Sequence, residues 1–150
     1  MKPFLFKLQT ALDIKLKEED IQKEKLYQAT KVYKQNLRML TGLKNRLVEI
    51  QDILRGKQVK NIDVLEIKNC QDYIPVLNER IKQQEEKTED SRLEMERVRS
   101  KLLEIMKKRK ILEKLKTRHY QEYMREFLRE EQKQIDEMAT IGYVHKDSAV

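Results

Sequence analysis

The sequence predicts an all-α fold, a long antiparallel two-helix coiled-coil hairpin with a short, kinked helical connector near residues 56–75. Its 150 residues include only three glycines and two prolines, where average usage would give roughly 18. The aromatic residues are three Phe and six Tyr, with no Trp, which is too few for a thick globular core. Apolar residues nevertheless recur with the alternating three- and four-residue spacing of a coiled coil.

The first helix is expected over about residues 4–55, interrupted only by Gly42. Two ladders of residues spaced by seven run along it, one from Leu5 and one from Leu8. The first ladder is Leu5, Leu12, Glu19, Leu26, Tyr33, Leu40, Leu47 and Leu54, and the second is Leu8, Lys15, Gln22, Ala29, Asn36, Leu43 and Ile50. The apolar rungs predict a buried seam, and the polar rungs predict a fixed register at some cost in stability.

The connector is expected over residues 56–75. Gly56 suits the left-handed position that ends many helices, and residues 56–61 form the expected loop. Asp63 and Glu66 have the spacing of a capping box, which predicts the start of a short helix. Pro75 removes a backbone hydrogen bond, so we expect a kink or a break just before it.

The second helix is expected over about residues 76–139, which contain neither Gly nor Pro. Its ladders are Ile74, Ile81, Thr88, Met95, Leu102 and Leu77, Gln84, Ser91, Val98, Ile105, Leu112. Beyond Leu112 the apolar positions change phase, which predicts looser pairing. Residues 1–139 then form a single coiled-coil domain, and residues 140–150 a flexible tail.

A turn near residue 65 would pair residues whose numbers add to about 130, for example Leu12 with Arg118. A parallel homodimer of two rods is the alternative, but it leaves the loop and the matched helix lengths unexplained. The antiparallel hairpin is therefore the preferred arrangement.

Positive charge is concentrated in residues 1–61, which hold 14 basic and seven acidic side chains, and in residues 101–118. The net charge is +7, and residues 101–118 alone hold eight basic and two acidic side chains. The centre of that stretch is a basic collar of four residues, Lys107, Lys108, Arg109 and Lys110. Such a collar is either a solvated helix face or a surface for an acidic partner or nucleic acid. Aromatic residues are not interleaved with the collar, which argues against nucleic acid.

Enzymatic chemistry is not expected, and neither is a cofactor. The glycines are too far apart for a phosphate-binding loop, and His119 and His145 have no ligand companions at metal-site spacing. Cys70 is the single cysteine, so no internal disulfide is possible. Carboxylates are abundant, but a two-helix rod is not expected to form a concave pocket that would shift their pKa values.

A protein partner is expected because a two-helix hairpin cannot cover all of its apolar residues. Ile14, Ile21, Val32 and Leu37 lie outside the ladders and should stay exposed. The N-terminal residues do not form a signal peptide, because Lys7 interrupts their apolar run. No apolar stretch approaches the roughly 20 residues of a membrane span, so a cytoplasmic protein without membrane insertion is expected.

Several segments resemble the FliJ family, small soluble components of the bacterial flagellar export apparatus. The opening residues 4–13, Phe-Leu-Phe-Lys-Leu-Gln-Thr-Ala-Leu-Asp, resemble the start of that family. The later motifs are Tyr73-Ile74-x-x-Leu77, Leu112-Glu113-Lys114-Leu115 and Glu131-Gln132-Lys133-x-x-Asp136-Glu137-x-Ala139. The resemblance extends over about residues 4–139.

The resemblance implies a stalk similar to the γ subunit of rotary ATPases. Such a stalk would insert into the hexameric export ATPase, promote its ring assembly, and link it to export chaperones and to the cytoplasmic domain of a membrane export gate protein. It would thereby associate peripherally with the inner face of the cell membrane. The implied ATPase contacts are Leu5, Leu8, Leu12, Phe127, Gln132, Asp136 and Glu137. The implied gate contacts, nearer the turn, are Asn36, Leu40, Leu43, Leu47, Tyr73, Leu77 and Arg80.

Two other functions remain open at the level of the sequence. One is a generic structural coiled-coil scaffold, and the other is a nucleic-acid-binding rod that uses the basic collar. The related virulence-type export systems have a stalk protein of the same architecture, so the type of export system is also open.

Overall fold

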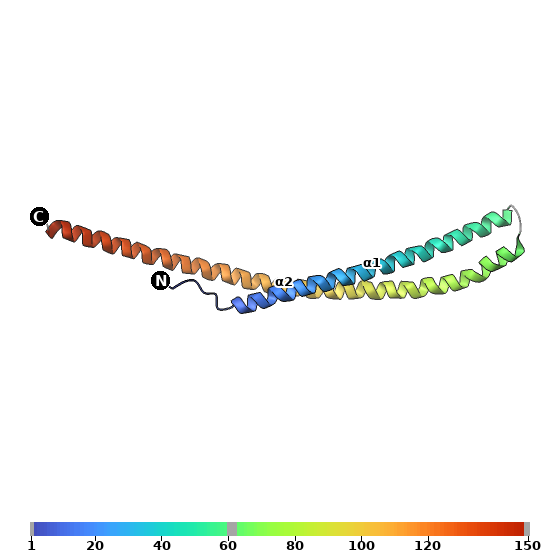
Figure 1. The fold of residues 1–150 in the computed structure, drawn as a ribbon, viewed down its shortest axis with the longest axis horizontal. Coiled ribbons are helices and arrows are strands. Elements are labelled where there is room, and N and C mark those ends of the chain that lie inside the picture. The colour runs from blue at the N-terminus through green and yellow to red at the C-terminus, as the bar shows by residue number, and fades with distance from the viewer. Residues whose placement is uncertain (1, 60–62, 149–150) are drawn as a thin grey trace. The chain divides into compact units, whose positions relative to one another are not determined.

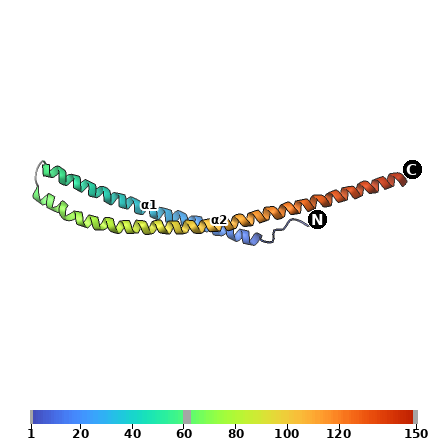
Figure 2. The same ribbon diagram turned by 180° about the vertical axis from the view of Figure 1, so that it is seen from behind.

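The computed structural model describes residues 2–59 and 63–148, which form two long α-helices and no strand. Helix α1 is Gln9–Val59 and helix α2 is Val64–Ser148. On either side of the turn the green end of α1 and the green-to-yellow part of α2 lie side by side in both views (Figure 1, Figure 2). The predicted all-α helical hairpin is confirmed.

The connection between the helices is shorter than the sequence predicted. α1 continues past Gly56 to Val59, and among the described residues no glycine has a positive φ, so the predicted left-handed glycine is wrong. Asp63 does cap α2, because its carboxylate accepts a hydrogen bond from the Glu66 amide at 3.4 Å. The rest of the predicted loop, residues 60 and 61, lies outside the described residues.

Pro75 lies inside α2, so of the kink or break expected before it, the break does not occur. An internal proline costs a helix about 3 kcal/mol. Its neighbours Tyr73, Ile74 and Leu77 all contribute to one hydrophobic cluster. Because a helix that continues through Pro75 keeps all three against that cluster, their burial offsets the cost of the proline.

The outer ends of both helices also differ from the prediction. α1 begins at Gln9 rather than near residue 4, because Phe6 is buried in a non-helical segment whose carbonyl accepts a bond from the Gln9 amide at 3.1 Å. α2 continues to Ser148, where a flexible tail was expected from residue 140. The last two residues of that expected tail, 149 and 150, lie outside the described residues.

The chain divides into two compact units: residues 20–104, the hairpin unit, and residues 1–19 with 105–150, the terminal unit. In the hairpin unit the hydrophobic core is centred on Ile50, Leu77 and Ile81. Six partly buried side chains pack around these three, namely Leu40, Leu43, Leu47, Cys70, Tyr73 and Ile74. In the terminal unit Phe6, Leu12 and Ile105 are buried.

Two polar layers cross the seam of the hairpin unit. The Gln22 side-chain amide donates to the Val98 carbonyl at 3.1 Å. The Gln84 amide donates to the Asn36 carbonyl at 3.1 Å and lies 3.2 Å from the Asn36 side-chain oxygen. The numbers of each pair, 22 with 98 and 36 with 84, add to 120 rather than the expected 130, because α1 ends at Val59 and α2 already begins at Val64, before the predicted centre of the hairpin at residue 65. The predicted polar rungs therefore do set the register, several residues away from the predicted one.

Replacing Leu77 by Ala should lower the free energy of unfolding by about 3 kcal/mol, because this side chain is fully buried and its loss leaves a cavity. Replacing the adjacent Val76 by Ala, which is 47% exposed, should change the same quantity by less than about 1 kcal/mol. Urea denaturation followed by circular dichroism measures both. Equal effects at the two positions would contradict the placement of the seam.

Replacing Gln84 by Ala should cost about 1–2 kcal/mol of unfolding free energy, because a buried hydrogen-bonding group is removed from the seam. The same change at the exposed neighbour Gln83 should stay within about 0.5 kcal/mol. If both variants unfold at the wild-type urea concentration, the polar layer does not stabilise the hairpin.

Candidate functional site

The residues expected to face the export gate gather in the seam of the hairpin unit. Leu40, Leu43, Leu47 and Tyr73 are partly buried against the core cluster, so each presents one edge to solvent. Leu77 is completely buried, so it supports this surface from inside and is not available to a partner. Arg80 is exposed, and Asn36 is half-buried in the polar layer with Gln84.

The residues expected to face the ATPase ring differ in how exposed they are in the terminal unit. Leu12 is buried at 4% exposure and belongs to the seam, whereas Leu5 is 79% exposed. Leu8 is exposed, and Phe127 is half-buried and stacks on Tyr123 with ring centroids 6.4 Å apart. Leu5 and Leu8 are therefore the members of this set at the N-terminus that a partner could contact directly.

The other three expected ring contacts lie on the last part of α2. Gln132, Asp136 and Glu137 are exposed, and the Gln132 amide donates to the Asp136 carboxylate at 3.0 Å. Every residue from 128 to 146 is exposed, and α2 extends beyond the N-terminal segment in both views (Figure 1, Figure 2). Within the terminal unit, this part of α2 has no described side chain packed over it.

An uncovered apolar face continues along this last part of α2. Leu128, Ile135, Met138 and Ile141 are all more than half exposed. On a helix with 3.6 residues per turn, Phe127 and Met138 differ in direction by only about 20°. Met138 therefore points in nearly the same direction as Phe127, although Glu131 and Gln134 lie between them on that side of the helix, and no side chain of the described residues covers Met138. We call residues 128–146 the α2 extension.

An aromatic cluster that the sequence analysis missed holds the N-terminal segment on α2. Phe4 contacts Tyr120 and Tyr123, with ring centroids 5.2 and 5.6 Å apart, and the Tyr123 hydroxyl donates to the Lys2 carbonyl at 2.7 Å. Phe6 contacts His119 at 5.8 Å in an edge-on arrangement. Tyr120 and Tyr123 lie one helical turn apart on α2, but the residues that they contact, Phe4 and Lys2, are more than a hundred residues away in the sequence. Only the correct register predicts these contacts.

The four residues of the basic collar differ in their contacts. Arg109 forms ion pairs with Glu19 of α1 and, at 2.8 Å, with Glu113 of α2. Hydrogen bonds to Glu113 and Glu19 raise the pKa of Arg109 above its ordinary value, because the two carboxylates stabilise the charged guanidinium. Arg109 thus joins the two helices within the terminal unit, and the exposed members of the collar are Lys107, Lys108 and Lys110.

The described residues do not assemble a metal or membrane site. Between residues 2–59 and 63–148, no group of three His, Cys, Asp or Glu side chains is placed to hold a metal ion. Neither helix, over its described length, has an apolar stretch long enough to cross a membrane.

Replacing Phe6 by Ala should release the N-terminal segment, because Phe6 is only 6% exposed and truncating a buried Phe costs about 3 kcal/mol. Hydrogen–deuterium exchange of a peptide spanning residues 2–12 should become at least tenfold faster. The Leu5→Ala variant is the matched control, since Leu5 is exposed, and its exchange should not change. A Phe6→Ala protein that exchanges like wild type would show that the aromatic cluster does not anchor this segment.

Comparison with known protein families matches residues 4–148 to the family described as "Flagellar FliJ protein". No curated protein and no solved structure matches the chain. The matched range covers nearly the whole chain and includes both helices, both units and all the residues implied as partner contacts. FliJ proteins are non-catalytic components associated with flagellar protein export, which agrees with the absence of expected catalytic chemistry in the sequence. The chain belongs to the FliJ family.

Proposed function

We propose that this protein is a stalk of the flagellar type III export apparatus, which inserts its terminal unit into the hexameric export ATPase and stimulates it. The α2 extension carries this proposal. Leu128, Ile135, Met138 and Ile141 are more than half exposed, so no side chain of the described residues covers the apolar face that they form. An unpaired amphipathic helix gains stability only when another surface covers that face.

The hexameric ATPase is the proposed partner for this face because of the family membership. A ring of subunits can surround a single helix on all sides, whereas a flat surface covers only one stripe. The exposed Leu5 and Leu8 would add to the same contact at the N-terminal end of the terminal unit.

The hairpin unit is the proposed contact for the export gate. Leu40, Leu43, Leu47 and Tyr73 each expose one edge beside a rigid, fully buried Leu77. Apolar edges held by a packed core need little reordering when they bind, which lowers the entropic cost of association. Binding of this unit to the cytoplasmic domain of the gate protein would hold the chain at the inner face of the membrane. Export chaperones are further proposed partners, on the basis of the family alone.

The test is to mix the purified chain with its cognate export ATPase. At a saturating concentration, the chain should raise the rate of ATP hydrolysis and the amount of hexameric ATPase ring detected by sedimentation. The Met138→Glu variant should reduce the stimulation at least fivefold, because it places a charge in the centre of the uncovered face.

Tyr143→Glu provides a matched control. Tyr143 is as exposed as Met138 but points about 140° away from it around the helix, so this variant should stimulate like wild type. No increase in hydrolysis or ring formation at saturation would refute the proposal. Equal losses in the two variants would refute the assignment to the apolar face.

A further inference from the structure

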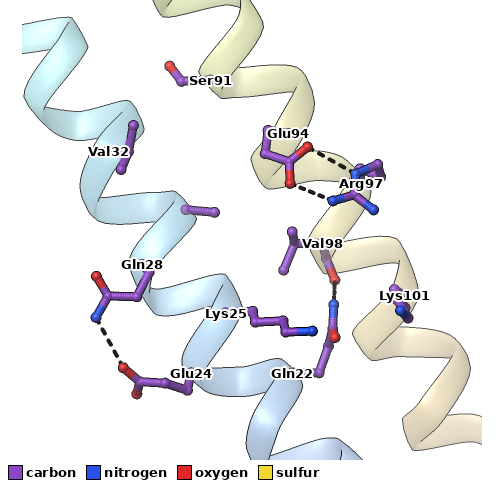
Figure 3. A pocket seen from close by; sticks show the side chains of 11 residues that line it. Gln22, Glu24, Lys25, Gln28, Val32, Ser91, Glu94, Arg97, Val98 and Lys101 are labelled. Atoms are coloured by element: carbon purple, nitrogen blue, oxygen red, sulfur yellow. Dashed lines mark hydrogen bonds and ion pairs between the residues drawn. The ribbon is translucent and has the colours of Figure 1, made fainter.

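A groove runs between α1 and α2 in the hairpin unit, where the sequence predicted no concave surface. Its volume is about 500 Å³. Gln22, Lys25, Ala29 and Val32 line it from α1, and Figure 3 shows the facing side chains of α2, Ser91, Glu94, Val98 and Lys101. The small side chains of Ala29 and Ser91 leave the space open, because larger side chains on those rungs would fill the seam.

The polar groups in the floor of this groove are already satisfied within the chain. The Gln22 amide donates to the Val98 carbonyl at 3.1 Å, and the Ser91 hydroxyl donates to the Thr88 carbonyl at 2.8 Å. Each of these two side chains therefore already donates one hydrogen bond within the chain. What the groove offers a partner is therefore the apolar surface of Val32, which is 49% exposed, and of the half-buried Ala29, whereas Val98 lines the floor but is only 5% exposed. Such a floor favours an apolar side chain of a partner.

Most charges around the groove are also satisfied. Arg97 pairs with Glu94 through two hydrogen bonds, of 2.9 and 2.5 Å, and the Gln28 amide donates to Glu24 at 3.1 Å. Both bonded pairs are visible at the rim (Figure 3).

Two exposed lysines at the groove remain unpaired. Lys25 extends from α1 across the hollow toward α2 (Figure 3). Neither Lys25 nor Lys101 has an ion pair with any residue in the described ranges 2–59 and 63–148. Two ammonium groups beside an apolar floor are therefore left for the carboxylates of a partner.

We propose that this groove binds one acidic amphipathic helix of another protein. Apolar side chains of that helix enter the hollow over Ala29, Val32 and Val98, and its carboxylates meet Lys25 and Lys101. Lys25 and Val32 are seven residues apart on α1, about 10.5 Å along the helix. The partner helix accordingly carries its acidic residues about two turns from its apolar anchor, the spacing of helix-in-groove recognition.

A second copy of this chain is a poorer occupant than an acidic protein. Each copy carries a net charge of +7, so two copies repel each other at low ionic strength. The proposed surface uses neither the α2 extension nor the leucines assigned to the export gate. It therefore adds a third binding surface, and its test does not depend on the other two.

The experiment uses the full chain and synthetic helical peptides. The probe is an 18-residue peptide with leucines at positions i, i+3, i+4 and i+7, glutamates on both flanks, and one Trp beside the leucines. Because the chain has no Trp, fluorescence of the peptide reports its burial without background. The acidic peptide should bind with a dissociation constant on the order of 10–100 µM, and a peptide with Lys in place of every Glu should bind at least tenfold more weakly.

Variants of the chain locate the binding site. The double variant Lys25→Glu/Lys101→Glu should weaken binding of the acidic peptide at least tenfold, and Ala29→Leu, which fills the hollow, should do the same. The matched control Lys82→Glu/Lys87→Glu makes the same charge change on exposed residues outside the groove and should bind within a factor of about three of wild type. Circular dichroism checks the fold of every variant.

Each outcome decides the proposal. If Ala29→Leu does not fold, the Lys25→Glu/Lys101→Glu variant decides alone, because both lysines are exposed. Absence of binding at 1 mM acidic peptide, equal binding of the basic peptide, or equal losses in the groove variant and its control would each overturn it. Chemical-shift changes confined to residues 22–32 and 91–101 on addition of the acidic peptide would support it.

Discussion

Two helices that pack only on each other can bury one stripe of side chains apiece, and this limit controls the other properties of the molecule. Among the described residues nine hydrophobic side chains are buried, whereas 24 large ones are exposed. A third or fourth helix would normally cover this surface. Because no such helix is present among the described residues, exposed apolar side chains in both units are available to other proteins. The proposed binding surfaces thus result from the same small number of helices that defines the fold.

The seam uses some of its few buried positions for polar side chains, and these decide which residues face each other. Glu19, Gln22, Gln84 and Thr88 are all buried, where apolar side chains would give more stability. In exchange the amides of Gln22 and Gln84 each reach one backbone carbonyl on the facing helix. A slipped register would leave these amides buried without an acceptor, at a cost of about 1–3 kcal/mol each. The polar rungs thus exclude registers that the repeating leucines alone would permit.

The sequence predicted the features that repeat and missed those that depend on distant contacts. Heptad spacing is a local property, so the two helices and the buried or half-buried ladder positions could be read directly. The course of the chain at Pro75 depends on how firmly Tyr73 and Leu77 are held by α1, which no local rule contains. Because the predicted centre of the hairpin was at residue 65, the predicted register was shifted as well, and it did not pair Phe4 with Tyr120. For the candidate sites, the sequence proposed which leucines contact partners, but only packing separates the buried Leu12 and Leu77 from the exposed Leu5.

A surface on a two-helix protein indicates a binding site when its polar groups are hydrogen-bonded within the chain but its apolar side chains are uncovered or its charged side chains lack an ion pair. Single exposed residues such as Ile21 meet no such condition, since scattered apolar side chains are normal. The α2 extension meets it through four large apolar side chains, Leu128, Ile135, Met138 and Ile141, that are all more than half exposed. The groove at Ala29 meets it differently, because Gln22, Ser91 and Arg97 each form a hydrogen bond within the chain, whereas Val32 is 49% exposed and Lys25 and Lys101 form no ion pair with the described residues. The first surface offers apolar side chains alone, whereas the second also offers positive charge, so the two proposed surfaces would select partners of different chemistry that need not compete with each other.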